Sequence, residues 1–183
     1  MLYYPILVRK IQHLTDARYF AAVGVDYLSL VLDESQLSFD RWHAIRDWVE
    51  GVSLVAEPSN ENESLLAKII IDAKPNGLLV TPSMLPNVPA EIELFMIAAS
   101  AIDPSRPLGT SLILELPAEL INAEFQLLET EDALFIQTEW TPVLVAKVLH
   151  QGYEGGFCFT GGKEEITGVR DYNVMDDMIS LLR

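Results

Sequence analysis

Three consecutive segments near the start of the chain indicate its fold: Ile6-Leu7-Val8-Arg9-Lys10-Ile11, then Asp16–Val23, then Tyr27-Leu28-Ser29-Leu30-Val31-Leu32. The first and third are short and rich in Val, Ile and Leu, which is typical of strands. The middle segment has apolar residues at helical spacing. Two strands joined by a helix lie parallel, with a right-handed connection in nearly all known cases. This unit therefore predicts an α/β protein with a parallel sheet.

The same alternation continues along the chain. Further strands are predicted at Val52–Glu57, Gly77–Thr81, Glu93–Ala98, Ser111–Leu116, Ala133–Thr138 and Gly156–Thr160. Further helices are predicted at Phe39–Val49, Glu63–Ala73, Pro142–His150 and Tyr172–Leu182. Several strands are apolar without alternation, as expected when both faces of a parallel sheet are buried. Eight strands in this order predict a compact (β/α)8 TIM barrel, and an open doubly wound sheet is the alternative.

The chain is short for such a barrel, with 183 residues against a typical ~250. The connections Pro82–Pro89 and Asp103–Gly109 are rich in proline and leave little room for a full helix. Ala118–Leu128 has room for one short helix. We therefore expect one TIM-barrel domain over residues 1–183, with outer helices shortened or missing around strands four to six.

The composition narrows the classes of partner. The net charge is −15, so the chain lacks the cationic surface that nucleic-acid binding needs. A single cysteine, Cys158, excludes an internal disulfide; its position within an apolar strand predicts a buried, inert thiol. No apolar run approaches the ~18 residues that span a bilayer, and Met1–Pro5 lacks the cationic start of a signal peptide. We expect a cytoplasmic protein that binds a small molecule, without a membrane or nucleic-acid partner.

Three motifs are similar to those of one enzyme family. Lys10-Ile11-Gln12-His13-Leu14-Thr15-Asp16-Ala17 is similar to its Lys-Ile-Cys-Gly-hydrophobic-Thr and Asp-Ala pattern. Leu134–Pro142 lies where the family has a hydrophobic strand, Ala-Gly-Gly and a proline-led helix, and Gly162–Asp171 matches its Gly-Val-Glu and Gly-x-Lys-Asp. The family is phosphoribosylanthranilate isomerase of tryptophan biosynthesis. The resemblance implies a TIM barrel and an intramolecular aldose–ketose (Amadori) isomerisation, and we expect neither a cofactor nor a metal.

The catalytic positions of that family are substituted in this chain. The family uses a cysteine at the end of strand one and an aspartate at the end of strand six as its acid and base, and the resemblance puts Gln12 and Glu115 there. A carboxamide cannot act as a general base, whereas Glu115 keeps a carboxylate. His13, beside Gln12, is a candidate proton carrier because histidine titrates near neutrality, and a hydrogen-bonded structural histidine is the alternative.

The family's phosphate-binding glycines after strand seven are also replaced. The resemblance puts Thr138 and Glu139 at these positions, where a side chain blocks the close approach that glycine allows and a negative charge repels phosphate. After strand eight, Gly161-Gly162 gives a weak phosphate signal that a sharp strand-to-helix turn explains equally well. Lys163 is a candidate anion ligand, and an ion pair with Glu164, Glu165 or Glu139 is the alternative.

Acidic residues gather at the predicted strand ends. Glu57, Glu115, Glu139 and Glu164 follow or end four different strands, and the C-terminal ends of barrel strands share one mouth. Crowded carboxylates suit a cation or a cationic polar metabolite, although a chain this acidic carries acidic strand ends without any function.

Three hypotheses follow from these patterns. The first is an isomerase-like barrel that has lost all or nearly all of the isomerisation and binds another small metabolite or a cation at its acidic mouth. The second is an active isomerase that uses Glu115 and His13 as acid and base. The third is an oligomeric interaction module, such as a homo-oligomer, because missing outer helices would expose apolar strand surface to a second subunit.

Overall fold

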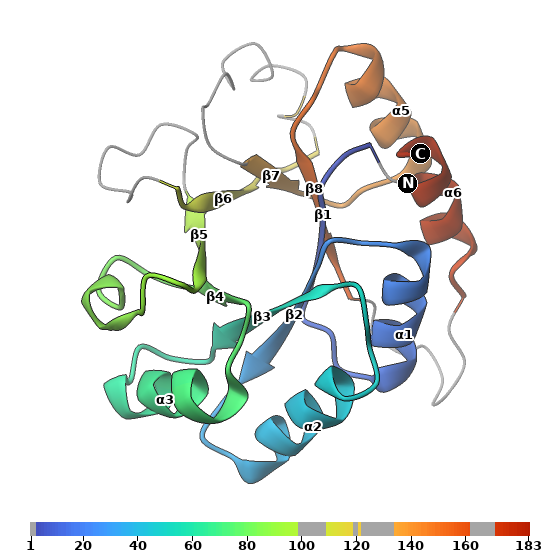
Figure 1. Cartoon of the computed structure of the whole chain (residues 1–183). Helices are drawn as coiled ribbons and strands as arrows, with labels where there is room; N and C mark the ends of the chain where they lie inside the picture. The colour runs from blue at the N-terminus through green and yellow to red at the C-terminus, as the bar shows by residue number, and fades with distance from the viewer. Residues whose placement is uncertain (1–2, 99–108, 119–120, 122–133, 162–170) are drawn as a thin grey trace.

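The strands form a closed parallel barrel in the computed structural model, which describes residues 3–98, 109–118, 121, 134–161 and 171–183. Each strand pairs with the next along the chain, and β8 pairs with β1. The helices lie on the outside of the barrel (Figure 1). The predicted TIM barrel is therefore confirmed, and the open doubly wound sheet is wrong.

The strands and helices lie close to their predicted positions. The strands are β1 Ile6–Arg9, β2 Tyr27–Leu32, β3 Ser53–Pro58, β4 Gly77–Leu79, β5 Glu93–Ala98, β6 Ser111–Glu115, β7 Leu134–Gln137 and β8 Gly156–Thr160. The helices are α1 Leu14–Val23, α2 Gln36–Arg46, α3 Glu63–Lys68, α5 Pro142–His150 and α6 Asn173–Leu181. No helix in the described ranges is long and apolar enough to cross a membrane.

Capping residues explain where two of these helices begin. Thr141 accepts a hydrogen bond from the Leu144 N–H at 3.2 Å, and Pro142 follows it at the first helical position of α5, as predicted. The helix predicted at Phe39–Val49 begins at Gln36 and ends at Arg46 instead. Its start is earlier because the Ser35 hydroxyl accepts from a backbone N–H of the first turn.

The connection between β4 and β5 has no outer α-helix, as predicted. A short 3-10 turn at Leu85–Asn87 takes its place. The predicted connection Asp103–Gly109 lies outside the described residues except for Gly109, and Ala118–Leu128 lies outside them except for Ala118 and Ile121.

The barrel interior is filled by its own apolar cluster. Its members are Leu7, Val55, Phe95, Ile113, Phe135 and Cys158. Two glycines make room for the phenylalanine rings: a Cβ on Gly77 would lie 2.7 Å from the Phe95 ring, and one on Gly156 would lie 2.5 Å from the Phe135 ring. Each phenylalanine ring fills the space beside a glycine, and the narrow interior of the barrel would not hold two large side chains at these places.

The outer faces of β5 and β6 are buried within the chain. Met96, Leu112 and Leu114 are all at most 3% exposed. The exposed strand surface that motivated the oligomer hypothesis is therefore not present at these positions, and the oligomeric state stays a prediction.

Candidate functional site

A buried arginine lies inside the barrel near the C-terminal ends of the strands. Arg9 ends β1 and is 2% exposed. Side chains of a strand alternate between its two faces, so Arg9 shares the inward face with Leu7 of the interior cluster. Its Nε donates to Glu57 Oε1 at 3.0 Å, and its Nη2 donates to Glu57 Oε2 at 2.7 Å. This is the planar two-bond geometry that guanidinium and carboxylate groups favour.

The same guanidinium reaches two further strands. Arg9 Nη1 donates to Glu115 Oε1 at 3.0 Å and to Gln137 Oε1 at 2.7 Å. Glu115 ends β6 and Gln137 ends β7, and the two are register partners. One side chain thus connects the ends of β1, β3, β6 and β7.

Hydrogen bonds and neighbouring negative charge keep the buried Arg9 in its charged form. The Ser29 hydroxyl donates to Glu57 Oε1 and accepts from the Lys10 N–H at 3.2 Å. Burial acts to lower the pKa of Arg9, but the hydrogen bonds from Arg9 to Glu57 and Glu115 and the surrounding negative charge together outweigh it, so this pKa is raised. Arg9 is therefore a fixed positive charge that pairs with Glu57 and Glu115.

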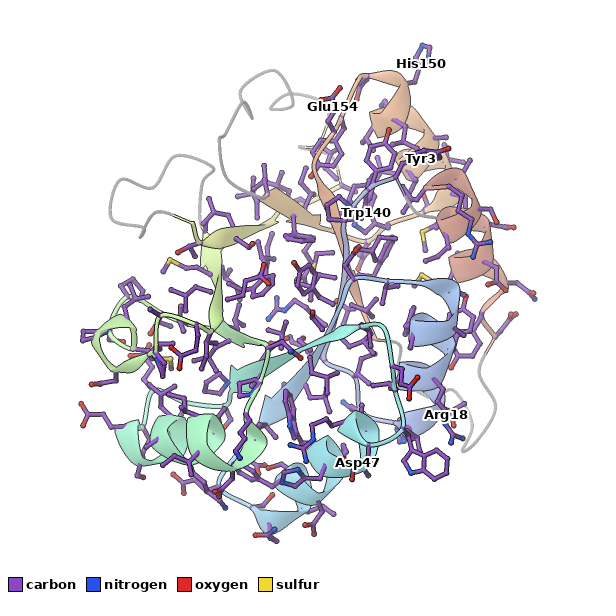
Figure 2. All side chains as sticks on the ribbon, viewed as in Figure 1. Tyr3, Arg18, Asp47, Trp140, His150 and Glu154 are labelled. Atoms are coloured by element: carbon purple, nitrogen blue, oxygen red, sulfur yellow. The ribbon has the colours of Figure 1, made fainter. Side chains whose placement is uncertain are left out.

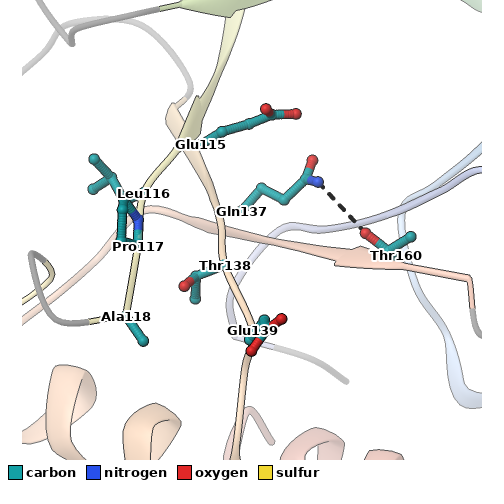
Figure 3. A pocket seen from close by; sticks show the side chains of 8 residues that line it. All are labelled: Glu115, Leu116, Pro117, Ala118, Gln137, Thr138, Glu139 and Thr160. Atoms are coloured by element: carbon teal, nitrogen blue, oxygen red, sulfur yellow. Dashed lines mark hydrogen bonds between the residues drawn. The ribbon is translucent and has the colours of Figure 1, made fainter.

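A pocket of about 520 Å³ opens beside this network (Figure 3). Its described lining is Glu115, Leu116, Pro117, Ala118, Gln137, Thr138, Glu139 and Thr160. The volume lies within the usual range for small-molecule sites. The pocket lies at the C-terminal ends of β6, β7 and β8, which is the end of the barrel where enzymes of this fold have their active sites.

The charged groups in the described lining of the pocket are carboxylates. Glu115 has a side chain that is 50% exposed, and Glu139 is exposed as well. Arg9 is absent from this lining, and its single positive charge is shared between Glu57 and Glu115. The described part of the pocket therefore has a net negative charge.

A buried tryptophan fixes the turn that carries Thr138 and Glu139. The Trp140 indole Nε1 donates to the carbonyl oxygens of Ile136 at 3.2 Å and Cys158 at 3.1 Å. Its backbone N–H donates to the Thr138 carbonyl at 3.0 Å. Trp140 lies on the side of the barrel that α5 and α6 cover (Figure 2). The chain after β7 is thus anchored between strand and helix, with Glu139 directed to the pocket.

The predicted site residues fall into separate groups. One pocket is lined by Glu115, Thr138 and Glu139. Glu57 is linked to Glu115 through Arg9, which donates hydrogen bonds to both carboxylates. Gln12 is exposed and His13 is half-buried just before α1, and neither belongs to the described lining of the pocket.

Of the two glycines after β8 that were candidates for phosphate binding, Gly161 is among the described residues and Gly162 is not. The Gly161 N–H donates to the Arg9 carbonyl at 2.6 Å, so the pairing of β8 with β1 already uses it. Gly162, Lys163 and Glu164 lie outside the described residues.

Two further observations concern metal binding and the cysteine. The described residues hold no group of three His, Cys, Asp or Glu side chains arranged to bind a metal ion. Cys158 is fully buried in the barrel interior, its Sγ donates to Gln137 Oε1 at 3.4 Å, and burial raises the pKa of its thiol. The predicted buried thiol is confirmed.

The sequence pattern did not identify Arg9 as a site residue. The available signal was one charged residue in the apolar strand Ile6-Leu7-Val8-Arg9, two positions from an inward-facing leucine. A charge at such a position needs a partner, but the sequence does not show which strand supplies it.

A closed (β/α)8 barrel with a polar pocket at the C-terminal ends of its strands is the architecture of a large class of enzymes. Among solved structures, phosphoribosyl anthranilate isomerase from Thermus thermophilus superimposes with a TM-score of 0.73 at 16% identity, covering 97% of this chain and 98% of that one. The N-(5'-phosphoribosyl)anthranilate isomerase from Pyrococcus furiosus gives 0.73 at 12% identity, covering 98% of each.

A protein with a different name has the same fold. Thiamine phosphate pyrophosphorylase from Pyrococcus furiosus gives a TM-score of 0.65 at 8% identity, covering 98% of this chain and 96% of that one. No family model and no curated protein sequence matches this chain. At these identities the likeness shows the fold, and one fold supports many different reactions.

Proposed function

We propose that this chain is a barrel of the phosphoribosylanthranilate isomerase type that has lost all or nearly all of the isomerisation. It instead binds a small neutral or cationic polar metabolite at its acidic mouth. The observation that carries the proposal is that Glu115 and Glu139 line one pocket, while the single charge of Arg9 is shared between Glu57 and Glu115.

Three positions support the loss of the isomerase chemistry. Gln12 has a carboxamide where the resembling family has its cysteine, and a carboxamide does not ionise near neutral pH and cannot act as a general acid or base. Glu139 contributes a negative charge where the family binds phosphate. The Gly161 N–H, a potential phosphate donor, is bonded to the Arg9 carbonyl.

The charge of the pocket favours one class of ligand over another. A carboxylate acting on a unit charge ~6 Å away contributes about 1 kcal/mol when both groups are partly solvated. The contributions of Glu115 and Glu139 have the same sign and add. Together they favour a cation over an anion of similar size by roughly tenfold or more in affinity.

Complementation tests the lost activity. A tryptophan auxotroph that lacks the isomerase is transformed with the gene for this chain, with a functional isomerase as the positive control. We expect no growth without tryptophan even when the protein accumulates in soluble form. Robust growth would refute the loss of activity.

A series of three sugars with one ring size and three charges tests the ligand class. Glucosamine at mildly acidic pH is a cation, glucose is neutral and glucuronate is an anion. Amide NMR signals of Gln137, Thr138 and Thr160 report binding in the pocket. We expect affinity to fall from glucosamine to glucose to glucuronate, and Glu139→Gln to narrow the differences. Equal affinities, or binding outside these residues, would refute the proposed pocket.

An active isomerase is the second candidate, and the position of Glu115 favours it. Glu115 ends β6 and lines the pocket with a half-exposed side chain, so its carboxylate is within reach of a bound substrate. If Glu115 and His13 were acid and base, Glu115→Gln and His13→Ala would each lower turnover by ~100-fold or more. If neither substitution has this effect, the second candidate fails.

A further inference from the structure

We propose that Arg9 is a positioning residue that fixes the hydrogen-bonding pattern of the pocket, so that a ligand meets an acceptor from Glu115 beside a donor from Gln137. Arg9 is absent from the described lining of the pocket and acts through these two side chains. The ligand class inferred below rests on the proposed function, whereas the positioning of the two side chains does not.

Arg9 fixes Glu115 by one of its two oxygens. Nη1 donates to Glu115 Oε1 at 3.0 Å. The Glu115 side chain is nevertheless half exposed and lines the pocket, so its Oε2 is available to accept a hydrogen bond from a ligand.

Arg9 also decides which way the Gln137 amide faces. The Gln137 carbonyl oxygen accepts from Arg9 Nη1 at 2.7 Å and from Cys158 Sγ at 3.4 Å. The amide nitrogen therefore faces the other way, and it donates to Thr160 Oγ1 at 3.4 Å (Figure 3). The reverse orientation would put an NH2 group against a guanidinium N–H, which is a contact between two donors.

Glu57 makes this arrangement rigid. It holds the guanidinium plane with two hydrogen bonds from inside the barrel, and Ser29 in turn donates to Glu57. Because Glu57 already holds the planar guanidinium of Arg9 in place, this group loses little further conformational entropy when it orients Glu115 and Gln137. The buried pair thus supports the pocket in the way that a preorganised site requires.

The resulting pattern matches hydroxyl groups. A hydroxyl can donate to the Glu115 carboxylate and accept from the Gln137 amide, and neighbouring hydroxyls of a sugar can share the two. An ionised carboxylate or phosphate offers acceptors alone and leaves the Glu115 acceptor unmatched. We infer a polyhydroxyl ligand, neutral or cationic.

The test compares free proteins by NMR, without any ligand. In the wild type, the Gln137 side-chain amide gives a pair of signals shifted by its fixed contacts. Arg9→Met/Glu57→Met removes the two buried charges together and leaves no unpaired ion inside the barrel, because Glu115, which also loses its bond to Arg9, is half exposed to solvent. We expect the double variant to fold and the Gln137 pair to move to the averaged position of a solvated amide. An unchanged Gln137 pair in the folded double variant would overturn the positioning role.

Arg9→Lys gives a second route should the double variant fail to fold. Lysine keeps the charge opposite Glu57 but lacks the planar fork that reaches two further side chains. We expect the Gln137 signals to move as they do in the double variant. Glu93→Gln is the matched control, since Glu93 bonds Tyr27 from the first residue of β5 and contacts neither Gln137 nor Arg9. Unmoved signals in Arg9→Lys, or equal movement in the control, would overturn the proposal.

Sugar binding separates this inference from the proposed function. The double variant removes one positive and one negative charge, so the net charge of the pocket region is unchanged. We expect glucose and glucosamine to bind roughly tenfold more weakly than to the wild type, which is the effect of losing one oriented hydrogen bond to a charged group. Their affinity ratio should stay the same. Undiminished sugar binding would overturn the ligand class. If no sugar binds the wild type, the proposed function fails, and the amide signals still decide the positioning role.

Discussion

Arg9 and Glu57 face each other inside the barrel from strands β1 and β3, joined by two hydrogen bonds of 3.0 and 2.7 Å. Both residues are at most 4% exposed. Arg9 is one cation that pairs with both Glu57 and Glu115, so negative charge remains in excess when Glu139 is included, and the acidity of the chain extends into the pocket. The pair also couples the interior of the barrel to its mouth through Gln137.

Removing one member of this pair should destabilise the fold strongly. Glu57→Gln removes the buried counter-charge of the Arg9 guanidinium and leaves only the half-exposed Glu115 beside it. Loss of one partner of a buried ion pair costs about 3–5 kcal/mol of the free energy of unfolding in comparable cases. Urea unfolding followed by circular dichroism measures the change. Asp47→Asn is the control, since the Arg46–Asp47 pair is exposed and 3.6 Å apart, and we expect it to change stability by at most ~1 kcal/mol. Equal effects of the two substitutions would contradict the buried character of the Arg9–Glu57 pair.

The two glycines inside the barrel should not tolerate a methyl group. Gly77→Ala and Gly156→Ala each place a Cβ within 2.7 Å of a phenylalanine ring that the barrel holds on all sides. We expect a loss of about 1–3 kcal/mol for each, measured by urea unfolding. Adding Phe95→Leu to Gly77→Ala, or Phe135→Leu to Gly156→Ala, should recover part of the lost stability. Full stability of both alanine variants would contradict the packing of the interior.

Alkaline pH should weaken the fold through Tyr27. Burial, together with the charge of Glu93, raises the pKa of Tyr27 from 10.0 to about 12. Above pH 10 the unfolded chain releases this proton while the folded chain keeps it. The stabilising contribution of Tyr27 is therefore fully present below pH 10 and is lost as the pH rises to about 12.

Tyr27→Phe checks this dependence. Urea unfolding across the same pH range should show that the free energy of unfolding falls less steeply with pH in the variant. The difference in slope should correspond to the release of up to one proton fewer on unfolding. Some loss should remain, because burial also raises the pKa of Tyr19 and Tyr153. If the free energy of unfolding falls equally steeply with pH in the variant and the wild type, Tyr27 is not a source of the alkaline loss of stability.

The single thiol should be unreactive in the folded protein. Cys158 is fully buried, and burial raises its pKa, so little reactive thiolate forms. We expect a thiol reagent such as Ellman's reagent to modify it only at the rate of unfolding, and rapidly in urea. Fast, complete modification under native conditions would show that the barrel interior is open to solvent.

Much of the fold follows from local pattern. Tyr27–Leu32, Glu93–Ala98 and Gly156–Thr160 are strands with the predicted bounds, and α5 spans the predicted Pro142–His150. These segments are apolar runs between turn residues, or a helix with its cap in sequence, so neighbouring residues contain the signal. The start of α2 was misplaced because Ser35 caps it ahead of the apolar residues.

The site depends on contacts that local pattern does not contain. The strand ends at Glu57 and Glu115 were predictable because all strands of a parallel barrel end at one mouth. The pairing of Arg9 with Glu57 was not, because it depends on the register and inward orientation of two strands that are far apart in sequence. The orientation of Gln137 depends on that pairing in turn.

The relative affinity of the wild-type protein for glucosamine and glucuronate tests the central claim most directly. Both sugars have one ring and opposite charges, and the amide signals of Gln137, Thr138 and Thr160 locate the binding. We predict that glucosamine binds in this pocket at least ~10-fold more tightly than glucuronate, as two carboxylates in its lining require. Equal or tighter binding of glucuronate at the same residues would contradict an acidic, anion-excluding barrel mouth.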